Sequence, residues 1–366
     1  MPLPASTTTL VFRPELNGLR AVAVGVVVLQ HWVRPPFPLG EIGPSLFFVL
    51  SGYLVSGIVW RYGAYAGAPG RWWPRVRIFY VRRALRIVPA YYLALAAGAL
   101  LPLATLHEHP GWFMLLVNNV LIYKAKGWGD GIGHFWTIAV EAQFYLLWPF
   151  ALGWLGRRLQ GLLALALAGW CFRALWALWV QLDMVHLLLP SSLDLFALGG
   201  VLCLAEGAPW LVRLARGRYV LLAWLSWTAL RFALDPGPWA AVWAISEGSV
   251  LALADFLTIG WLLHVPAAGR RLGLTKPAMQ WLGQRSYGLY LYHLPLFVFW
   301  QRLVYHFVPD AAGRAAWMGP LPTLLVLGPV LAGLAAASWH FVEEPLDRLK
   351  NRFQYRKASQ AVVAAH

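Results

Sequence analysis

Repeated long apolar stretches constrain this chain more than any other feature of its sequence. Eleven of them follow one another with short polar breaks, and most approach or exceed the roughly 18 residues that indicate a membrane-spanning helix. Hydrophobic residues make up 60% of the 366 positions, and charged residues only 12%. A soluble core does not need so many helices that are apolar all round, and a β-barrel would show short alternating segments instead. The sequence therefore predicts an all-α polytopic membrane protein.

One apolar stretch is too short to cross a bilayer, and the others predict the topology. The stretches cover residues 16–33, 44–60, 78–101, 112–123, 135–155, 161–180, 186–206, 219–234, 239–264, 286–307 and 321–342. The fourth has about 12 residues, which is typical of a re-entrant or interfacial segment. If it does not cross, most of the 30 Lys and Arg residues fall on one side, as expected for the cytoplasmic side. We expect ten spans, cytoplasmic termini, a membrane domain over 1–346 and a disordered basic tail over 347–366.

The net charge of +15 does not point to nucleic acid, because the arginines punctuate the apolar spans as topology signals do. Residues 71–89 concentrate six cations before the third span. They are either a topology determinant that touches lipid phosphates or a site for a polyphosphorylated ligand, because the Arg fork matches phosphate oxygens. The two cysteines form no disulfide framework, and no metal spacing occurs.

Arg20 and His31 lie eleven positions apart in the first apolar stretch. Eleven residues are about three helical turns, so both side chains fall on one face, with a rise of roughly 16 Å between them. A positive-inside anchor and an interfacial histidine would explain the pair simply. Alternatively, the pair holds an anionic head and a reactive tail in line.

Five further polar residues fall in the middle third of other spans, where they are costly. They are Ser51, Glu141, Asp194, Glu247 and His293. Six polar groups from six spans, with His31 included, predict a shared polar cavity.

Each of these residues also has a structural interpretation. Ser51 with the following glycine suits a small-residue helix contact, and His293 suits a packing histidine. Asp194 and Glu247 suit ion pairs with Arg173 or Arg231. A carboxylate in lipid must be protonated or paired, and we expect Glu141 to pair with His31.

The motifs that carry these residues resemble the membrane acyltransferase-3 family of integral-membrane O-acyltransferases. The resemblance extends roughly from Phe12 to Pro345. The motifs are Arg20-x10-His31, FFVLSGYL at 47–54, RRALRIVPAY at 82–91, FWTIAVEAQFYLLWP at 135–149, DLFALGG at 194–200, SYGLYLYHLP at 286–295 and Glu344–Pro345. Each motif alone is weak, but the ordered set is specific.

The resemblance implies an enzyme that moves an acyl group, usually acetyl, from cytoplasmic acyl-CoA to a hydroxyl without a metal. The acceptor in such enzymes is often a sugar of a surface glycan or of its lipid-linked precursor, and otherwise a small molecule such as a macrolide. It also implies a bacterial inner-membrane location among lipids. Some members are joined to a soluble esterase-like domain. Because little sequence follows Pro345, we expect the membrane domain or a separate partner to complete delivery.

The resemblance and the spacing together imply a mechanism. Phosphates of acetyl-CoA would contact Arg20, Arg82, Arg83 and Arg86, and the thioester would reach His31. His31 would act as general base, oriented by Glu141. Ser51, Tyr53, His293 and Asp194 are oxyanion or acceptor-site candidates. An acyl-enzyme on His31 or Ser51 is the competing mechanism.

Two other classes of membrane protein are also compatible with the sequence. Buried carboxylates and histidines in ten spans also suit a proton-coupled transporter, and a receptor or structural membrane protein is a third possibility. Within enzymes, residues 102–134 are rich in aromatic and amide groups that can hold sugar rings. The same aromatics also suit an interfacial belt.

Overall fold

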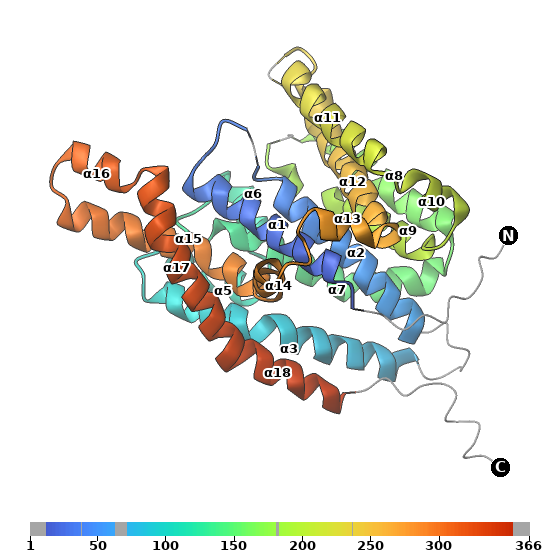
Figure 1. The fold of residues 1–366 in the computed structure, drawn as a ribbon, viewed down its shortest axis with the longest axis horizontal. Helices are drawn as coiled ribbons and strands as arrows, with labels where there is room; N and C mark the ends of the chain where they lie inside the picture. The colour runs from blue at the N-terminus through green and yellow to red at the C-terminus, as the bar shows by residue number, and fades with distance from the viewer. Residues whose placement is uncertain (1–11, 38, 63–71, 181–182, 236, 354–366) are drawn as a thin grey trace.

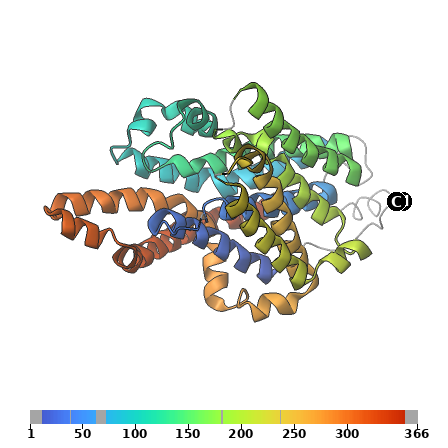
Figure 2. The ribbon, with the colours of Figure 1, turned by 90° about the horizontal axis from the view of Figure 1, so that it is seen from above.

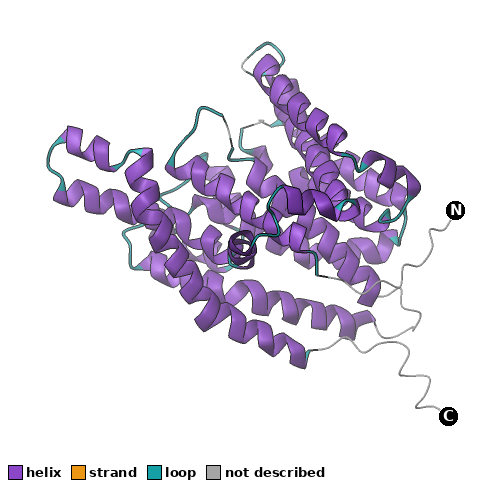
Figure 3. Ribbon diagram, viewed as in Figure 1, coloured by secondary structure: helices purple, strands orange, loops and turns teal. Residues whose placement is uncertain are grey.

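The computed structural model describes residues 12–37, 39–62, 72–180, 183–235 and 237–353, and every element in these ranges is helical (Figure 3). This confirms the predicted all-α class. Arg71 of the basic segment and residues 354–366 of the predicted tail lie outside the described residues.

The ten apolar stretches predicted to span each contain one main helix, in the predicted order. These helices are α1 (Pro14–Trp32), α2 (Ile42–Tyr62), α3 (Trp72–Ala99), α7 (Trp136–Leu155), α8 (Leu159–Trp179), α9 (Leu193–Leu204), α11 (Gly217–Leu234), α12 (Ala240–His264), α15 (Ser286–Phe307) and α17 (Pro320–Ser338). Continuous apolar sequence favours a helix there, because a helix satisfies its own backbone hydrogen bonds in lipid.

Shorter elements connect the long helices. They are α4 (Ala104–Glu108), α5 (Pro110–Met114), α6 (Asn118–Ala125), η1 (Gly133–Phe135), η2 (Val185–Leu187), η3 (Leu189–Ser192), α10 (Pro209–Leu214), α13 (Pro266–Arg271), α14 (Pro277–Gln284), α16 (Ala311–Trp317), a π-helical turn η4 (Trp339–Glu343), α18 (Glu344–Leu349) and η5 (Lys350–Arg352). The stretch 112–123 is divided between α5 and α6, as its short length predicts. The predicted tail begins inside α18, so its described part is helical rather than disordered.

Five helical segments within the described ranges are long and apolar enough to cross a membrane. They are Ile42–Arg61, Gly133–Leu155, Leu159–Trp179, Ala240–His264 and Pro320–Leu349. The presence of several such helices indicates a multi-pass membrane protein. The count of ten spans and the side of each terminus stay predictions.

Helix α9 is shorter than the predicted stretch 186–206. Pro190 lacks an N–H, and the Ser191 hydroxyl donates to the carbonyls of Val185 and Leu188, both at 2.5 Å. These interactions hold the chain in two 3₁₀ turns, so the α-helix starts only at Leu193.

Helices α1 and α2 lie in the middle of the molecule (Figure 1), with α8–α12 to one side and α15–α17 to the other (Figure 2). Helix α2 packs directly on α9. A Cβ atom on Gly52 would lie 2.2 Å from the carbonyl oxygen of Phe196, and one on Gly199 would lie 2.2 Å from that of Val49. The glycine after Ser51 therefore makes the small-residue helix contact expected from the sequence.

Candidate functional site

A cavity lies between α1, α2, α3, α7 and α15. Its lining combines two arginines, one carboxylate and several aromatic and hydroxyl side chains. The lining residues are Arg20, Pro44, Phe47, Phe48, Arg86, Ile87, Thr137, Ile138, Glu141, Tyr145, Ser286, Tyr287 and Tyr290.

The two cavity arginines have no direct anionic partner in the part of the chain that the structure describes. Among the described residues, no ion pair joins Arg20 or Arg86 to a carboxylate. The Nε atom of Arg20 is buried without a hydrogen-bond partner in the described chain. The carboxylate of Glu141 instead accepts hydrogen bonds from the hydroxyls of Ser51 and Tyr145. The cavity thus presents two guanidinium groups that can receive phosphate oxygens.

Beside the cavity, three histidine rings meet. The His31 and His293 ring centroids are 5.0 Å apart, and those of His134 and His293 are 4.6 Å apart. Both His134 and His293 are buried.

The hydrogen bonds of this cluster determine which ring nitrogens carry protons. His31 Nδ1 lies 2.9 Å from the carbonyl oxygen of Val27, and His293 Nδ1 lies 2.6 Å from that of Tyr290. A carbonyl oxygen only accepts, so each Nδ1 carries the proton. His31 Nδ1 also lies 3.2 Å from His293 Nε2, which therefore accepts a share of the same proton. This assignment leaves the Nε2 lone pair of His31 without a partner among the described residues, as a general base requires.

Tyr290 and Thr137 join the cavity to the histidine cluster. Both line the cavity, and their hydroxyl oxygens are 2.6 Å apart. The Tyr290 hydroxyl donates to the His134 carbonyl at 2.8 Å. Helix α1 makes the same connection from the other side, because Arg20 lines the cavity and His31 lies in the cluster eleven residues later.

Comparison with known proteins identifies the family of this chain. Residues 13–339 match a family model described as "Acyltransferase domain". The chain belongs to this acyltransferase-3 family.

Curated relatives are consistent with that membership. The chain is 26% identical to the peptidoglycan O-acetyltransferase OatA of Listeria monocytogenes, over 77% of this chain and 49% of the relative. It is 26% identical to the putative peptidoglycan O-acetyltransferase YrhL of Bacillus subtilis, over 91% and 54%. The chain therefore spans about half the length of the curated relatives that it matches. No solved structure matches.

The match to an acyltransferase domain favours the enzyme over the transporter and receptor alternatives.

The expected contact between Glu141 and His31 is wrong. Glu141 is hydrogen-bonded by Ser51 and Tyr145, and the ring-nitrogen partners of His31 are Val27 and His293. The sequence indicates that Glu141 needs a partner, but two neutral hydroxyls fill that need. Glu141 remains in the cavity with Arg20 and Arg86.

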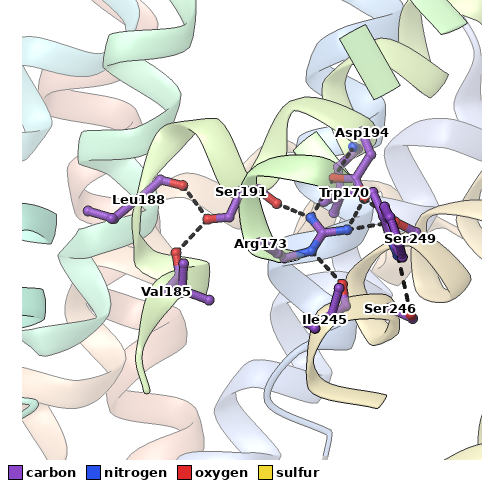
Figure 4. A network of polar contacts seen from close by, with 10 residues as sticks. Trp170, Arg173, Val185, Leu188, Ser191, Asp194, Ile245, Ser246 and Ser249 are labelled. Carbon is purple, nitrogen blue, oxygen red and sulfur yellow. Dashed lines mark hydrogen bonds and ion pairs between the residues drawn. The ribbon is translucent and has the colours of Figure 1, made fainter. Parts of the chain in front are cut away.

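Asp194 and Glu247 do not belong to the cavity. Arg173 binds the Asp194 carboxylate through both terminal nitrogens, at 3.1 and 2.6 Å, and Ser249 donates to the same carboxylate at 2.5 Å (Figure 4). Glu247 pairs with Arg231. The ion-pair interpretation is therefore confirmed for both carboxylates, and one polar cavity shared by all six predicted residues is wrong. Asp194 is an unsuitable acceptor-site residue because both of its oxygens are already bonded.

Tyr53 is also directed elsewhere. Its hydroxyl donates to Glu206 at 3.0 Å, and Glu206 in turn lies 3.4 Å from Arg13. Tyr53 is absent from the cavity lining, so its geometry does not support an oxyanion role. Ser51, with its hydroxyl on Glu141, fixes that carboxylate in the cavity.

The three arginines of α3 that were expected at the donor phosphates have three different surroundings. Arg86 lines the cavity. The Arg83 guanidinium stacks on Phe79 and Tyr145, with 5.0 Å to the Tyr145 ring centroid. Arg82 donates to the carbonyls of Lys350 and Phe353 at 2.8 and 2.9 Å, which ties the C-terminal segment to α3.

Lys350 adds a further cation at this end of the molecule. Burial lowers the pKa of the Lys350 ammonium, and the positive charges of Arg86 and Arg83 act in the same direction, although Lys350 donates to Asp347. The region next to the cavity arginines is therefore electropositive, which favours an anionic ligand.

Sequence reasoning missed His134. It immediately precedes the predicted span 135–155, so it was not counted among the polar residues at depth. The structure buries it beside His293, and its Nδ1 has no hydrogen-bond partner in the described residues. A histidine at the boundary of a motif-bearing span was the available signal.

Proposed function

We propose that this protein transfers an acetyl group from acetyl-CoA to a sugar hydroxyl of peptidoglycan, another surface polysaccharide or a lipid-linked precursor of one, in the bacterial inner membrane. The family supports acyl transfer, and two relatives are named for peptidoglycan O-acetylation. One observation carries the proposal. The same helix, α1, places Arg20 in a cavity whose arginines have no carboxylate partner among the described residues. It also places His31, with a ring nitrogen that no described residue hydrogen-bonds, in the adjoining histidine cluster.

The cavity arginines would bind the phosphates of the donor. Arg20 and Arg86 approach from α1 and α3 and offer their guanidinium groups to a polyanion. The distance along α1 from Arg20 to His31 is roughly 16 Å, about half the hydrocarbon thickness. A long, thin thioester arm can cover that distance, with its carbonyl carbon next to His31.

The chemistry at His31 is general-base acyl transfer. Nε2 of His31 removes the proton of the acceptor hydroxyl while that oxygen bonds to the thioester carbon. The C–S bond then breaks, and the proton returns from Nε2 to the departing sulfur. His293 acts as a positioning residue, because its Nε2 accepts from His31 Nδ1 and keeps the proton on that side of the ring.

The same free nitrogen also permits the competing mechanism, an acyl-enzyme on His31. Incubation with labelled acetyl-CoA and no acceptor separates the two routes. Direct transfer predicts no label on the protein, whereas a covalent route predicts label on His31 that is lost on addition of acceptor.

Purified full chain in detergent, assayed for acetyl transfer to muropeptides, tests the proposal. His31→Ala and Arg20→Ala should abolish transfer while the protein still inserts into membranes. The matched controls are His306→Ala and Arg213→Ala, which change exposed residues of the same types and should retain transfer. Wild-type activity in His31→Ala would refute the proposed base.

A further inference from the structure

Three aromatic rings from the loop before α7, the start of α7 and the η2 turn lie side by side. The His186 ring is 5.9 Å from the Trp128 ring at an interplanar angle of 35°, and 5.6 Å from the Trp136 ring at 79°. Trp128 is 47% exposed and His186 is also exposed, whereas Trp136 is half-buried. The three rings form a partly open surface, here called the aromatic platform.

The polar edges of the aromatic platform are unused. In the part of the chain that the structure describes, neither the indole N–H of Trp128 nor that of Trp136 donates a hydrogen bond. No ring nitrogen of His186 makes one there either. The indole N–H of Trp136 is not among the buried unpartnered groups, and the other two side chains are exposed. The platform therefore offers ring faces together with accessible hydrogen-bonding edges.

The loop that carries Trp128 is held by specific contacts. The Asp130 carboxylate accepts hydrogen bonds from the backbone N–H groups of Ala104 and Thr105. A Cβ atom on Gly133 would lie 2.0 Å from the Trp128 carbonyl oxygen, so the backbones at these two positions are in direct contact. The Trp128 ring is thus attached to a fixed loop that leads straight into His134.

The turn that carries His186 is also anchored. The Asn119 amide donates to the Leu187 carbonyl at 3.0 Å, and the Ser191 hydroxyl donates to the Val185 carbonyl at 2.5 Å. Preorganised surfaces bind with less loss of conformational entropy, so these contacts favour a binding role for the platform.

The aromatic platform borders the cavity that adjoins the histidine cluster. The Trp136 ring lies 6.0 Å from the ring of Phe48, which lines that cavity. Along the chain, Trp136 follows His134 by two residues, and the His134 ring lies 4.6 Å from the ring of His293, which contacts His31. A molecule that rests on the platform therefore lies beside the cavity that leads to the proposed base.

We infer that the aromatic platform is the acceptor subsite and that its ligand is a saccharide. The apolar C–H face of a pyranose ring suits the flat faces of Trp128 and His186, and its hydroxyls suit the free N–H and imidazole edges. This inference rests on the proposed function and specifies where that function binds its acceptor.

The subsite can be tested independently of catalysis by equilibrium binding of radiolabelled tetra-N-acetylchitotetraose. The full chain is used in detergent, without acetyl-CoA. Trp128→Ala should weaken binding about tenfold, the size expected for loss of one aromatic anchor. Trp128→Phe, which keeps a ring face, should stay within roughly threefold of the wild type. The matched control is Trp317→Ala, which removes another exposed tryptophan and should leave binding unchanged.

Steady-state transfer to the same saccharide gives the second readout. Trp128→Ala should raise the acceptor KM about tenfold and leave the KM for acetyl-CoA unchanged. The subsite would be overturned if wild type and Trp128→Ala bound the saccharide equally, or if the wild type did not bind it. Either result would indicate that these aromatic residues are an interfacial belt. Failure of the proposed function is a different result, namely saccharide binding that depends on Trp128 without transfer of the acetyl group.

Discussion

Two groups of polar residues lie in the helices of this member of the acyltransferase-3 family, and they differ in how their charges are partnered. Between α8, α9 and α12, Arg173 and Asp194 bond to each other and to Ser249, and both are buried. Between α1, α3, α7 and α15, no carboxylate within the described residues pairs with Arg20 or Arg86. His31 there keeps one ring nitrogen free.

This difference separates structural from chemical roles. A buried charge with all its bonds made holds helices together and has no capacity left for a ligand. Unpaired cations and a free imidazole nitrogen are costly unless a ligand uses them. The first group therefore predicts loss of stability on mutation, and the second predicts loss of activity.

The largest effect should come from Asp194→Ala. Removing one partner leaves the Arg173 guanidinium buried and unpaired, which should cost about 3–5 kcal/mol of stability. Thermal unfolding of purified protein in detergent measures this loss. The double variant Arg173→Met with Asp194→Leu should recover much of it, and a catalytic defect in a fully stable Asp194→Ala would contradict the structural role.

Arg86→Ala should mainly raise the KM for acetyl-CoA, by roughly 10- to 100-fold, because phosphates far from the reacting carbon contribute uniform binding. Steady-state kinetics at varied acetyl-CoA measures the change. Arg82→Ala is the comparison, because Arg82 donates to the C-terminal carbonyls and should change the KM less. A fall in kcat alone for Arg86→Ala would remove it from the phosphate site.

His293→Ala should lower kcat by about tenfold, because His31 Nδ1 loses an acceptor that orients the ring. His293→Gln should recover part of the rate, since its side-chain oxygen can accept the same hydrogen bond. The pH profile of kcat gives the second measurement, and the midpoint assigned to His31 should shift in His293→Ala. An unchanged profile and rate would make His293 a packing residue.

The smallest effect should come from Tyr53→Phe. It removes one hydrogen bond to Glu206, which is worth about 1 kcal/mol, and it should leave transfer kinetics unchanged. The melting temperature and kcat measured together check this. A large drop in kcat at normal stability would restore Tyr53 as an oxyanion donor.

The sequence predicts the order of the helices well. It predicts poorly how each helix is rotated about its axis relative to its neighbours. Long apolar stretches and charge breaks indicate how the long helices follow one another, so the order of α1, α2, α7 and α15 was predictable. Whether Glu141 turns toward His31 or toward Ser51 depends on how α7 packs on α2. That packing depends on contacts such as the hydrogen bond from the indole N–H of Trp148 on α7 to the Ser56 hydroxyl on α2, which the spacing of residues along one helix does not contain.

The sequence indicates which polar residues are candidate site residues better than it indicates which residues they contact. Arg20 and His31 could be selected because polar groups at depth are rare. The two roles of Asp194 could not be separated, because residues 173 and 194 meet only through the contact between α8 and α9. His134 escaped because it stands one position before its helix stretch, and only the fold places it against His293.

The central claim is tested most directly by a structure of the full chain with a bound acetyl-CoA analogue. In this analogue a methylene group replaces the thioester sulfur. The account predicts phosphate oxygens within hydrogen-bond distance of Arg20 and Arg86, and the acyl carbonyl carbon next to Nε2 of His31. An analogue bound outside this cavity, or bound in it with its acyl group directed away from His31, would contradict the account.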